Sequence, residues 1–484
     1  MTQGMLIGGQ ILRKDETIPV INPAEGEEFD HVPRADRNDV SHAVEAAYSG
    51  HQKLIEMPLY LRSKLLLDVA QRIRGKTDEL AIGMTQETGK LLRDSKYELI
   101  RTAFIFEQAA IESRRVFEGV FQTLDAFELP SGNENRVAFT VREPLGVVAG
   151  IIPFNFPAAA FAHKVAPALA VGNSVVLKPS ILAPITAIKV GEIVNNVGFP
   201  AGAINVITGR SSEIGSEMTN HELVNLITFT GSSDVGLEIA SRAIRNGKRV
   251  IMELGGSDPL LVLEDANIDH AARVAVKARF DYSGQFCNST KRIIVRDEVA
   301  DKFVSHFSDM VGKLRLGDPT DPEVEIGPVI SEEVITELDR AVQDAVSRGG
   351  KLVVGGARLK RRGFFYNPTV IDQTPLYATP LTEEIFAPLA PIVRVSSDEE
   401  AIEIANSMEY GLDASIFSKD FKRAYKLARQ IRSGTVMIND STRLRWDVLP
   451  YGGVKKSGIG REGMRDTMLE MTESKLIEAN MGAN

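Results

Sequence analysis

Short runs of β-branched and aliphatic residues alternate with helix-forming stretches through most of the chain. Apolar runs that are bounded by turn residues and separated by helices are typical of βαβ units on mostly parallel sheets. We therefore predict an α/β fold. The predicted strands are GVVAGII, NSVVLK, INVIT, LITFT, KRIIV, APIVRV, ASIF and TVMIN, and the predicted helices are Ile185–Val197, Asp234–Ile244, Val299–Leu314 and Lys422–Ile431.

The predicted strands fall into two regions, with a boundary near Glu253–Gly256. The stretch 38–121 is expected to be mainly helical. The polar patch Leu129–Arg136 followed by VAFTVRE indicates an exposed hairpin arm, and the tail EMTESKLIEAN indicates a further strand. A chain of 484 residues exceeds one ordinary core, so two or three domains are expected.

Charge and cysteine content narrow the class of protein. The 56 basic and 65 acidic residues give a net charge of −9, which argues against a general binder of nucleic acid or membrane surfaces. A single cysteine allows no internal disulfide and no cysteine cluster for zinc, so we expect a reducing, cytoplasmic compartment and no metal site. The first residues lack a signal-peptide pattern. The longest uncharged run, Pro144–Ala162, contains three prolines and is not predicted to cross a membrane.

The single cysteine, Cys287, lies in the polar stretch SGQFCNSTK, between a predicted helix and the strand KRIIV. A lone cysteine is more often a small buried residue than a reactive one. A loop position beside Gly284 and polar residues gives the access that a nucleophile requires, and the thiolate is intrinsically a strong nucleophile. Cys287 is therefore a candidate nucleophile.

Acyl chemistry at a cysteine also requires an oxyanion donor and a base. Asn155 lies in an apolar loop between two prolines, where its amide must bond either a structural partner or a substrate oxygen. Glu253, in MELGG, follows an apolar run and precedes two glycines. A carboxylate in that position is either part of a structural ion pair or a base in a cleft, and the residues alone leave both roles open.

The strand–loop–helix units of residues 147–232 are candidate cofactor-binding elements, because ligands bind at the carboxyl ends of such strands. Gly231 and Ser232 follow LITFT at the start of a predicted helix, where free N–H groups can hold a phosphate. Lys178 ends its strand before a proline, and it either holds a ribose or phosphate or is a solvated surface residue. The segment GIGREG (Gly458–Gly463) matches G-x-G-x-x-G but follows no strand of a βαβ unit, so we expect a loop or turn there.

Seven motifs together resemble the aldehyde dehydrogenase family over essentially the whole chain. Each motif is modest alone, but all seven occur in the family's order and with family-like spacing. They are PFNFP (Pro153–Pro157), LKPS (Leu177–Ser180), FTGS (Phe229–Ser232), MELGG (Met252–Gly256), GQFC (Gly284–Cys287), EEIFAP (Glu383–Pro388) and PYGGVKKSGIGRE (Pro450–Glu462).

The resemblance implies roles for the three candidate catalytic residues. Cys287 would attack the carbon of an aldehyde, and Asn155 with the backbone N–H of Cys287 would hold the developing oxyanion. Hydride would pass to nicotinamide, and Glu253 would activate the water that hydrolyses the resulting thioester. Family members that release the acyl group to coenzyme A typically lack this glutamate, so its presence favours a free carboxylic acid as product.

The resemblance also implies a cofactor site and a domain plan. Lys178 would contact the adenosine ribose, Ser232 the pyrophosphate, and Glu384 with Phe386 the nicotinamide ribose and ring, while Ser180, Gly231 and Gly255 belong to the same motifs. The implied fold has a Rossmann-like NAD(P)-binding domain (1–128 and 143–254), an α/β catalytic domain (255–448) and a small β oligomerisation arm (129–142 and 470–484) that would form a homodimer or homotetramer.

One departure from the family concerns the choice of cofactor. NAD-preferring relatives often carry a glutamate three residues after the lysine that Lys178 matches, and this chain has Ile181 there. Loss of that carboxylate removes two hydrogen bonds to the ribose of NAD. It also removes repulsion against the 2′-phosphate of NADP. Both NAD and NADP are therefore expected to be admissible.

The candidate substrate residues point in two directions. Phe286 precedes Cys287 where some relatives that bind phosphorylated aldehydes have arginine, and Phe156 adds a second apolar wall. Arg101, however, matches a position that holds the anion in relatives acting on glyceraldehyde 3-phosphate or phosphonoacetaldehyde, and Arg445 roughly matches another.

Guanidinium groups aimed at one site suit a carboxylate, sulfonate or phosphate tail. Alternatively, Arg443 and Arg445 are surface charges paired with Asp440 and Asp447, and Trp446 with the two phenylalanines suits an aromatic or aliphatic aldehyde. A coenzyme A-acylating enzyme and a protein on the same fold that has lost catalysis are further alternatives. Glu253 argues against the first of these, and the intact catalytic set argues against the second.

Overall fold

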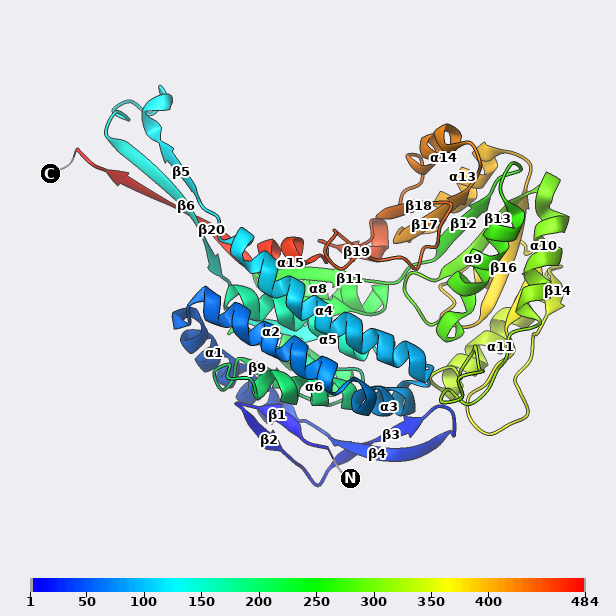
Figure 1. The fold of residues 1–484 in the computed structure, drawn as a ribbon, viewed down its shortest axis with the longest axis horizontal. Helices are drawn as coiled ribbons and strands as arrows, with labels where there is room; N and C mark the ends of the chain where they lie inside the picture. The colour runs from blue at the N-terminus through cyan, green and yellow to red at the C-terminus, as the bar shows by residue number, and fades with distance from the viewer. Residues whose placement is uncertain (1–2, 483–484) are drawn as a thin grey trace.

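Two large β-sheets and a narrow three-stranded arm make up the computed structural model, which describes residues 3–482 (Figure 1). The first sheet is parallel at its centre, with antiparallel strands at both edges. Its strands, in spatial order, are β19 (Gly458–Ile459), β11 (Arg249–Glu253), β10 (Val224–Thr230), β7 (Val147–Ile151), β8 (Ser174–Lys178), β9 (Ile204–Val206), β1 (Met5–Ile7) and β2 (Gln10–Leu12).

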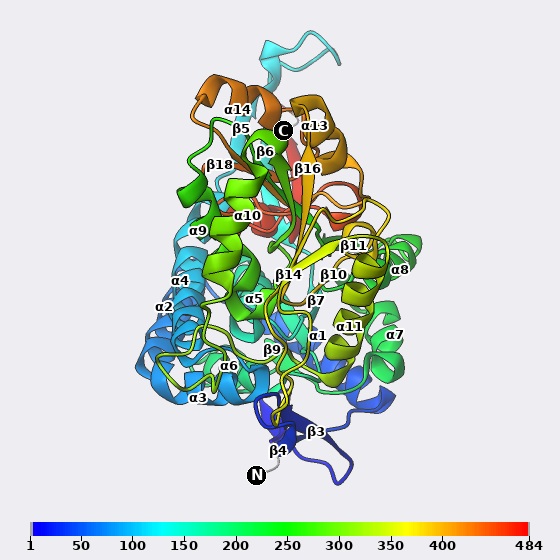
Figure 2. The same ribbon diagram turned by 90° about the vertical axis from the view of Figure 1, so that its right-hand side faces the viewer.

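Helices cover both faces of this sheet. They are α1 (Arg37–Glu56), α2 (Leu59–Gly75), α3 (Thr77–Thr88), α4 (Leu92–Val116), α5 (Pro157–Val171), α6 (Ile185–Asn195), α7 (Ser211–Asn220), α8 (Ser233–Arg245) and α15 (Met464–Glu470). Val175 and Leu177 of β8 pack into a core with α4, α5 and α6, whereas Val176 packs with α1, α7 and α8 on the other face. Figure 2 shows α2 and α4 on one side and α7 and α8 on the other. Burial on both faces explains why the strands are continuous apolar runs.

The second sheet repeats this design with other strands. In spatial order they are β14 (Lys351–Val354), β15 (Thr369–Asp372), β16 (Leu389–Val395), β13 (Thr290–Arg296), β12 (Asp258–Val262), β17 (Asp413–Phe417) and β18 (Thr435–Ile438). Its helices are α9 (Ile268–Phe280), α10 (Asp297–Val311), α11 (Glu332–Ser347), α12 (Thr379–Thr382), α13 (Asp398–Asn406) and α14 (Phe421–Ala428). Ile293 and Val295 of β13 face α9 and α10, while Ile294 faces α13 and α14.

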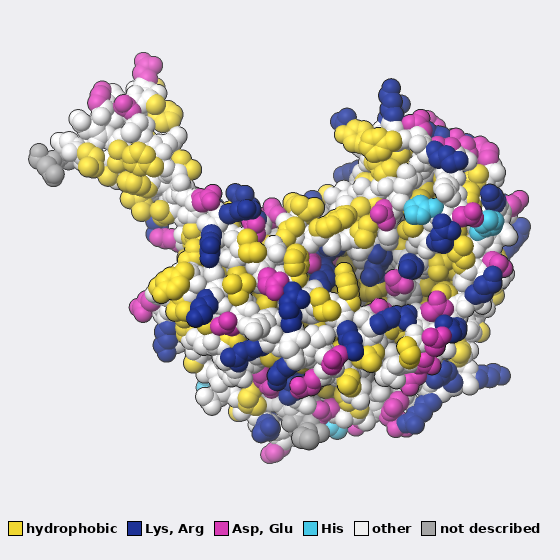
Figure 3. Space-filling view, viewed as in Figure 1, with side chains coloured by type: hydrophobic (Ala, Val, Ile, Leu, Met, Phe, Trp, Pro, Cys, Tyr) yellow, Lys and Arg dark blue, Asp and Glu magenta, His cyan; other side chains and the backbone are white. Residues whose placement is uncertain are grey.

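The arm projects from the first sheet. It pairs β6 (Arg136–Pro144) with β5 (Val120–Thr123) and β20 (Thr472–Asn480) in antiparallel register. It begins at Val120, earlier than the residue 129 expected from sequence, and residues 483–484 of the predicted tail lie outside the described part of the chain. Phe121 and Leu476 are 58% and 69% exposed, and Figure 3 shows apolar side chains gathered on the arm. At the opposite end of the molecule lies a hairpin of β3 (Thr17–Asn22) and β4 (Glu27–Pro33).

The α/β fold predicted from the hydrophobic pattern is confirmed, and the eight predicted strand runs coincide with β7 to β10, β13 and β16 to β18. The chain leaves the first sheet at Glu253 and enters the second at Asp258. The expectation of a loop at GIGREG is wrong for its first two residues. Gly458 and Ile459 pair with Glu253 and Met252, because the exposed edge of β11 offers backbone groups for an added antiparallel strand.

Candidate active site

A cavity of about 600 Å³ lies where the carboxyl ends of three first-sheet strands face the loop before β13. The chain runs from β7 outward to β8 and β9, and then adds β10 on the other side of β7. The crevice between β7 and β10 is therefore a topological switch point, the place where open α/β sheets bind ligands. The wall segments are Pro153–Phe156 after β7, Thr230–Ser232 after β10, Glu253–Gly255 after β11, and Phe286–Asn288 before β13.

A strained loop holds Cys287 at this cavity. Tyr282 and Ser283 have φ values of 48° and 56°, in the left-handed region that costs free energy for residues other than glycine. Each is fixed by its side chain, since the Tyr282 hydroxyl donates to the Thr88 carbonyl (2.8 Å) and the Ser283 hydroxyl donates to the Gly327 carbonyl (2.7 Å). Gly284 continues the turn at φ 71°, where a Cβ would meet the carbonyl of Ala387 at 2.8 Å. Cys287 thereby faces the cavity with partial exposure.

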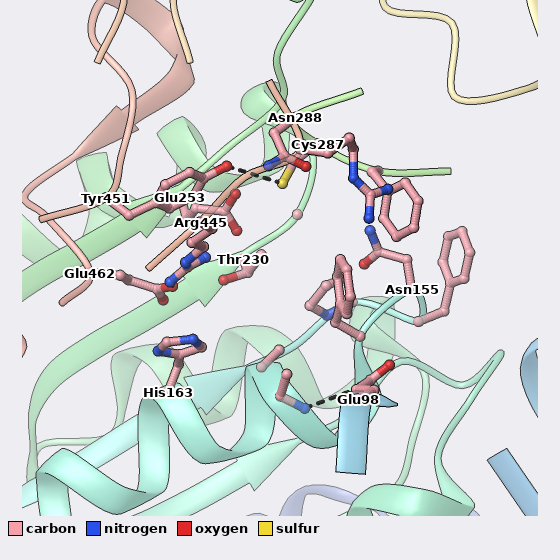
Figure 4. Close-up of a pocket in the computed structure, with 18 of the residues that line it drawn as sticks. Glu98, Asn155, His163, Thr230, Glu253, Cys287, Asn288, Arg445, Tyr451 and Glu462 are labelled. Carbon is pink, nitrogen blue, oxygen red and sulfur yellow. Dashed lines mark hydrogen bonds and ion pairs between the residues drawn. The ribbon is translucent and has the colours of Figure 1, made fainter. Parts of the chain in front are cut away.

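The sulfur of Cys287 has two polar neighbours. Its Sγ lies 3.7 Å from the hydroxyl of Tyr451, and Glu253 lies beside it (Figure 4). Burial raises the pKa of the thiol well above its usual value, and the negative charge of Glu253 raises it further. The resting thiol is therefore protonated, and its proton must leave when the sulfur attacks an electrophile.

Glu253 carries a buried carboxyl group with one oxygen that accepts no hydrogen bond from the described residues. It is 4% exposed, and its Oε1 has no hydrogen-bond partner among the described residues. Burial raises the pKa of Glu253, and the charge of Glu462 adds to this shift, while Arg445 opposes it. An unpartnered buried carboxyl that faces a cavity and has a raised pKa is typical of a catalytic base.

Asn155 is fixed next to the loop that carries Cys287. Its Nδ2 donates to the carbonyl of Gln285 (3.0 Å), which ties it to the Cys287 loop. The backbone carbonyl of Asn155 accepts a hydrogen bond from Lys90 Nζ (2.7 Å), and Lys90 forms an ion pair with Glu98. Glu98 also accepts N–H bonds from the first turn of α5 (3.0 and 3.1 Å), a favourable place for a carboxylate. The amide of Asn155 is therefore held rigidly beside the nucleophile.

Arg101 and Arg445 reach the cavity, but both are neutralised by carboxylates. Arg101 donates three hydrogen bonds to Asp447 (2.6 to 3.1 Å). Arg445 pairs with Glu462 (3.1 Å) and, as one interpretation of the sequence expected, also lies within ion-pair distance of Asp447 (3.8 Å). Burial would raise the pKa of Asp447, but its hydrogen bonds to His163 and Arg101 lower it. These two arginines are therefore parts of buried ion networks.

Arg443 differs from both. Its Nε and Nη1 have no hydrogen-bond partner within residues 3–482, and its guanidinium lies 3.0 Å above the centre of the Phe286 ring. Burial lowers the pKa of Arg443 to about 10, so it stays charged at neutral pH. Asp281 and Asp94 face it, yet neither lies within ion-pair distance. Arg443 is therefore a cation at the cavity that is not neutralised by a direct ion pair.

Two aromatic rings form the apolar wall. Phe156 and Phe286 stack with their centres 5.1 Å apart and an interplanar angle of 29°, and both line the cavity. The distance leaves no room for a flat group between them, so the pair acts as one wall. Trp446 lies at the surface, with 53% of its side chain exposed.

Most of the predicted cofactor residues lie along the carboxyl edge of the first sheet, and Glu384 and Phe386 reach the cavity from the segment before β16. The N-cap residue of α8, Ser232, makes no side-chain cap, so the first N–H groups of this helix are free for a phosphate. Gly231, Ser232, Gly255, Glu384 and Phe386 line the cavity, whereas Lys178, Ser180 and Ile181 lie at the end of β8. A Cβ on Gly255 would meet Glu384 Oε2 at 2.2 Å, so a larger residue there would displace this carboxylate.

Lys178 is buried, and its ammonium group donates a long hydrogen bond to the carbonyl of Pro179 (3.3 Å). Burial lowers the pKa of Lys178 to about 8. A nearly unpartnered ammonium at a strand end fits a hydroxyl-rich or phosphorylated ligand such as a dinucleotide. The surface-residue reading of Lys178 does not agree with this burial.

Sequence reasoning missed several residues of the site. Tyr451 lies within the recognised PYGG motif, and its hydroxyl was the signal that could have been read. Lys90 and Glu98 gave no signal, because a lysine in ETGKLL reads as a surface residue until the fold buries it. Within residues 3–482, no group of three or more His, Cys, Asp or Glu side chains could hold a metal ion. No helix in that range is both long and apolar enough to cross a membrane.

Comparisons with known proteins identify the family of the chain. The aldehyde dehydrogenase family profile matches residues 11–477. Lactaldehyde dehydrogenase of Methanocaldococcus jannaschii is 38% identical over 98% of this chain and 99% of that protein. The 3-sulfolactaldehyde dehydrogenase of Priestia megaterium is 36% identical over 99% of this chain and 98% of that protein.

Solved structures of aldehyde dehydrogenases have the same fold as this chain. The NADP-dependent glyceraldehyde-3-phosphate dehydrogenase of Bacillus halodurans, complexed with NADP, has a TM-score of 0.95 at 35% identity and covers 100% of both chains. Betaine aldehyde dehydrogenase of Staphylococcus aureus, in complex with NAD⁺, has a TM-score of 0.94 at 33% identity over 100% of this chain and 96% of that one. The chain belongs to the aldehyde dehydrogenase family.

Proposed function

We propose that this protein oxidises a small aldehyde to a free carboxylic acid with NAD or NADP. The observation that supports it best is the placement of Cys287, Asn155 and Glu253 around one cavity at the switch point of the first sheet. A nucleophile, an oxyanion donor and a base are the three groups that aldehyde oxidation through an acyl intermediate needs. The nicotinamide cofactor, when bound, supplies the hydride acceptor.

In the proposed first stage, Cys287 Sγ attacks the carbonyl carbon and the S–C bond forms. The Asn155 amide and the backbone N–H of Cys287 stabilise the negative oxygen that develops, which is the part of the reaction where fixed donors act most strongly. Departure of hydride from that carbon leaves a thioester on Cys287. Lys90 and Glu98 keep Asn155 in position throughout.

In the proposed second stage, Glu253 takes a proton from a water molecule that attacks the thioester. Its raised pKa makes it a stronger base than an exposed carboxylate, and its free Oε1 can accept the bond from water. Hydrolysis releases the acid and returns the thiol. The same glutamate favours hydrolysis over transfer to coenzyme A.

NAD and NADP are both proposed as cofactors. The uncapped N-terminus of α8 and the buried Lys178 support a dinucleotide with its pyrophosphate near Ser232. Ile181, beside Lys178, brings neither a carboxylate that would bind the ribose of NAD nor a charge that would repel the 2′-phosphate of NADP. Measured kcat/KM values for the two cofactors with one aldehyde would show which is preferred.

The substrate is proposed to carry a small anionic tail. Arg443 supports this, because a buried cation without a carboxylate partner attracts an anion that can satisfy its free N–H groups. Asp94 and Asp281 oppose a doubly charged group, so a carboxylate or sulfonate is favoured over a phosphate. A neutral aliphatic or aromatic aldehyde would use the Phe156–Phe286 wall and leave Arg443 unsatisfied.

Two experiments test these proposals. Formation of NAD(P)H from a panel of aldehydes should be lost in Cys287→Ala, and the product should be the free acid with or without coenzyme A. Turnover by Cys287→Ala would contradict the mechanism. Arg443→Met should raise KM about 10- to 100-fold for an aldehyde with a sulfonate tail. Arg443→Lys should recover part of the loss, and an equal rise in KM for a matched neutral aldehyde would refute the anion site.

Assembly into a homodimer or homotetramer is proposed for the arm. Its exposed Phe121, Phe139, Leu476 and Ile477 form an apolar surface of the kind that marks protein contacts. Light scattering on the full chain and on a Leu476→Glu variant tests it. A monomeric wild-type protein would contradict the assembly.

A further inference from the structure

A buried lysine lies between the candidate nucleophile and the residues expected to hold the nicotinamide half of the cofactor. Lys291 is the second residue of β13, and 1% of its side chain is exposed. Its ammonium group donates to the backbone carbonyl of Cys287 (2.7 Å) and to Glu384 Oε1 (2.8 Å). It also lies 5.4 Å from the centre of the Phe386 ring. One cation therefore contacts the peptide of the nucleophile and both of the expected nicotinamide residues.

The carboxylate of Glu384 is held at one oxygen and open at the other. Its Oε1 accepts hydrogen bonds from Lys291 and from the N–H of Gly256 (3.2 Å), whereas its Oε2 accepts none from the described residues. The Glu384 side chain is 18% exposed and lines the cavity. A fixed carboxylate with one free oxygen is suited to accept hydrogen bonds from ribose hydroxyl groups.

Lys291 itself is not among the residues that line the cavity, so it acts on a ligand only through its neighbours. Its ion pair with Glu384 offsets the cost of burying the ammonium group. Its second bond fixes the carbonyl of Cys287, which packs so closely that a Cβ on Gly256 would lie 2.9 Å from that oxygen. Any change in the charge or position of Glu384 is therefore felt by the cation that contacts the nucleophile's own peptide.

We propose that Lys291 is a positioning residue that couples the binding of the cofactor to the reactivity of Cys287. The inference rests on the proposed function, because it requires Glu384 to bind the nicotinamide ribose and Cys287 to be the nucleophile. When Glu384 accepts hydrogen bonds from ribose hydroxyl groups, its negative charge is shared with them, and it neutralises Lys291 less completely. The field of Lys291 at the sulfur then becomes more positive, which favours the reactive thiolate.

The charges around the sulfur support this direction. Burial and the charge of Glu253 raise the pKa of the Cys287 thiol, while the charge of Lys291 lowers it. Coupling between two sites is reciprocal, so a protein whose sulfur is held as a thiolate should also bind the cofactor more tightly.

Alkylation of the single cysteine by iodoacetamide, with and without cofactor, tests the coupling in the absence of any aldehyde. Mass spectrometry follows the rate at neutral pH, and calorimetric titration gives the NAD or NADP concentration that saturates each variant. The ratio of the rates with and without cofactor should be at least about 5-fold higher in wild type than in Lys291→Met. Cover of the sulfur by the nicotinamide ring would lower both ratios equally, so it does not affect the comparison.

The cofactor-free rates separate a role of charge from a role of packing. Lys291→Met should slow alkylation, because the sulfur loses a nearby cation and keeps Glu384. Glu384→Gln should speed alkylation, because Lys291 is no longer neutralised, and it should also lower the cofactor ratio towards that of Lys291→Met. The Glu384→Gln variant preserves the shape of the side chain, so it tests the coupling even if Lys291→Met does not fold.

A matched control is Lys248→Met, which should keep the wild-type ratio. Lys248 is also buried and donates to a backbone carbonyl, that of His221, but it does not line the cavity. An equal cofactor ratio in wild type and Lys291→Met would overturn the coupling. So would slower cofactor-free alkylation in both Lys291→Met and Glu384→Gln, since damage to packing would then explain both. Failure of the proposed function is a different result, the turnover of aldehyde by Cys287→Ala.

Discussion

The two walls of the cavity differ in whether their buried charged groups have partners. On the side of α4 and α5, three cations each have a carboxylate partner: Lys90 pairs with Glu98, Arg101 with Asp447, and Lys164 of α5 with Glu462. On the wall around Cys287, polar atoms of Glu253, Asp258, Asp413 and Arg443 are buried without a partner in the described structure. Lys90, Arg101, Glu253 and Arg443 all line one cavity, so their place in the molecule alone does not explain the difference.

The contrast separates structural groups from groups that are available for chemistry. A paired buried charge costs stability when one partner is removed, because the other is left uncompensated. A buried charge without a partner already lowers the stability of the folded protein. Such a charge is retained where a ligand, a water molecule or a proton binds to it. We therefore expect substitutions on the first wall to reduce stability, and isosteric substitutions on the second to raise stability while reducing activity.

Glu253→Gln should show the largest effect. Loss of the base should slow turnover by about 10²- to 10⁴-fold, because hydrolysis of the thioester loses its proton acceptor. The first stage should survive, so rapid mixing should give a burst of one NAD(P)H per active site followed by near-arrest. The variant should unfold at a temperature no lower than wild type, since Glu253 Oε1 has no partner to lose. Steady turnover without a burst at the wild-type rate would contradict the role of Glu253.

The sequence predicted the α/β fold because burial on both faces of a sheet makes each strand a continuous apolar run, as in NSVVLK. The resemblance also pointed to Asn155, Glu253 and Cys287 as a set, and in the structure these residues line one cavity, after β7, at the end of β11 and before β13. Strand-end positions are local, and topology brings them together.

The charge pairs could not be predicted in this way. Arg101 and Asp447 are separated by 346 positions, and the residues next to each of them do not indicate the other as its partner. The sequence predicted Arg101, Arg443 and Arg445 as substrate residues. The packed structure shows that, of these three, Arg443 is the one without a carboxylate partner among the described residues. Partner choice depends on distances of a few ångströms between side chains from different elements, which a pattern of residue types does not contain.

Lys164→Met should show the second-largest effect and tests the first wall. Lys164 is fully buried and donates to Glu462 (3.0 Å) and Thr228 (3.1 Å). Its removal leaves Glu462 with Arg445 alone, and we expect a loss of about 3 kcal/mol in the free energy of unfolding. Denaturant titration measures it, with Lys313→Met on the exposed Lys313–Asp309 pair as the control that should change little. Equal losses in both variants would remove the distinction between buried and surface pairs.

Arg101→Met and Arg443→Met compare the two walls directly, since the same side chain is truncated to the same group. Arg101→Met should lower the free energy of unfolding by about 2 kcal/mol, because Asp447 keeps only His163 and a distant Arg445. Arg443→Met should change it by less than about 1 kcal/mol in either direction, because no hydrogen bond is broken at Nε or Nη1. Thermal and denaturant unfolding of both variants test the comparison, and an equal loss in the two would contradict it.

Asp413→Asn should give the smallest change, and its sign depends on pH. The pKa of Asp413 is raised to about 7 in the folded protein from an ordinary value near 3.8, so the folded state binds this proton more tightly than the unfolded state. The resulting stabilisation is complete below the unfolded value and is lost as pH rises through about 7. Asparagine cannot ionise, so the stability of the variant relative to wild type should rise between pH 5 and pH 7 and level off above that range.

The groups that face Asp413 are unchanged in that variant, so the pH dependence isolates its own proton. Measured stability across this range should diverge from wild type, whereas a constant offset would mean that Asp413 does not titrate. A loss of stability at every pH would instead place Asp413 with the paired charges of the other wall. The facing groups are Asp258, Tyr451, Thr435, Glu253 and Arg445.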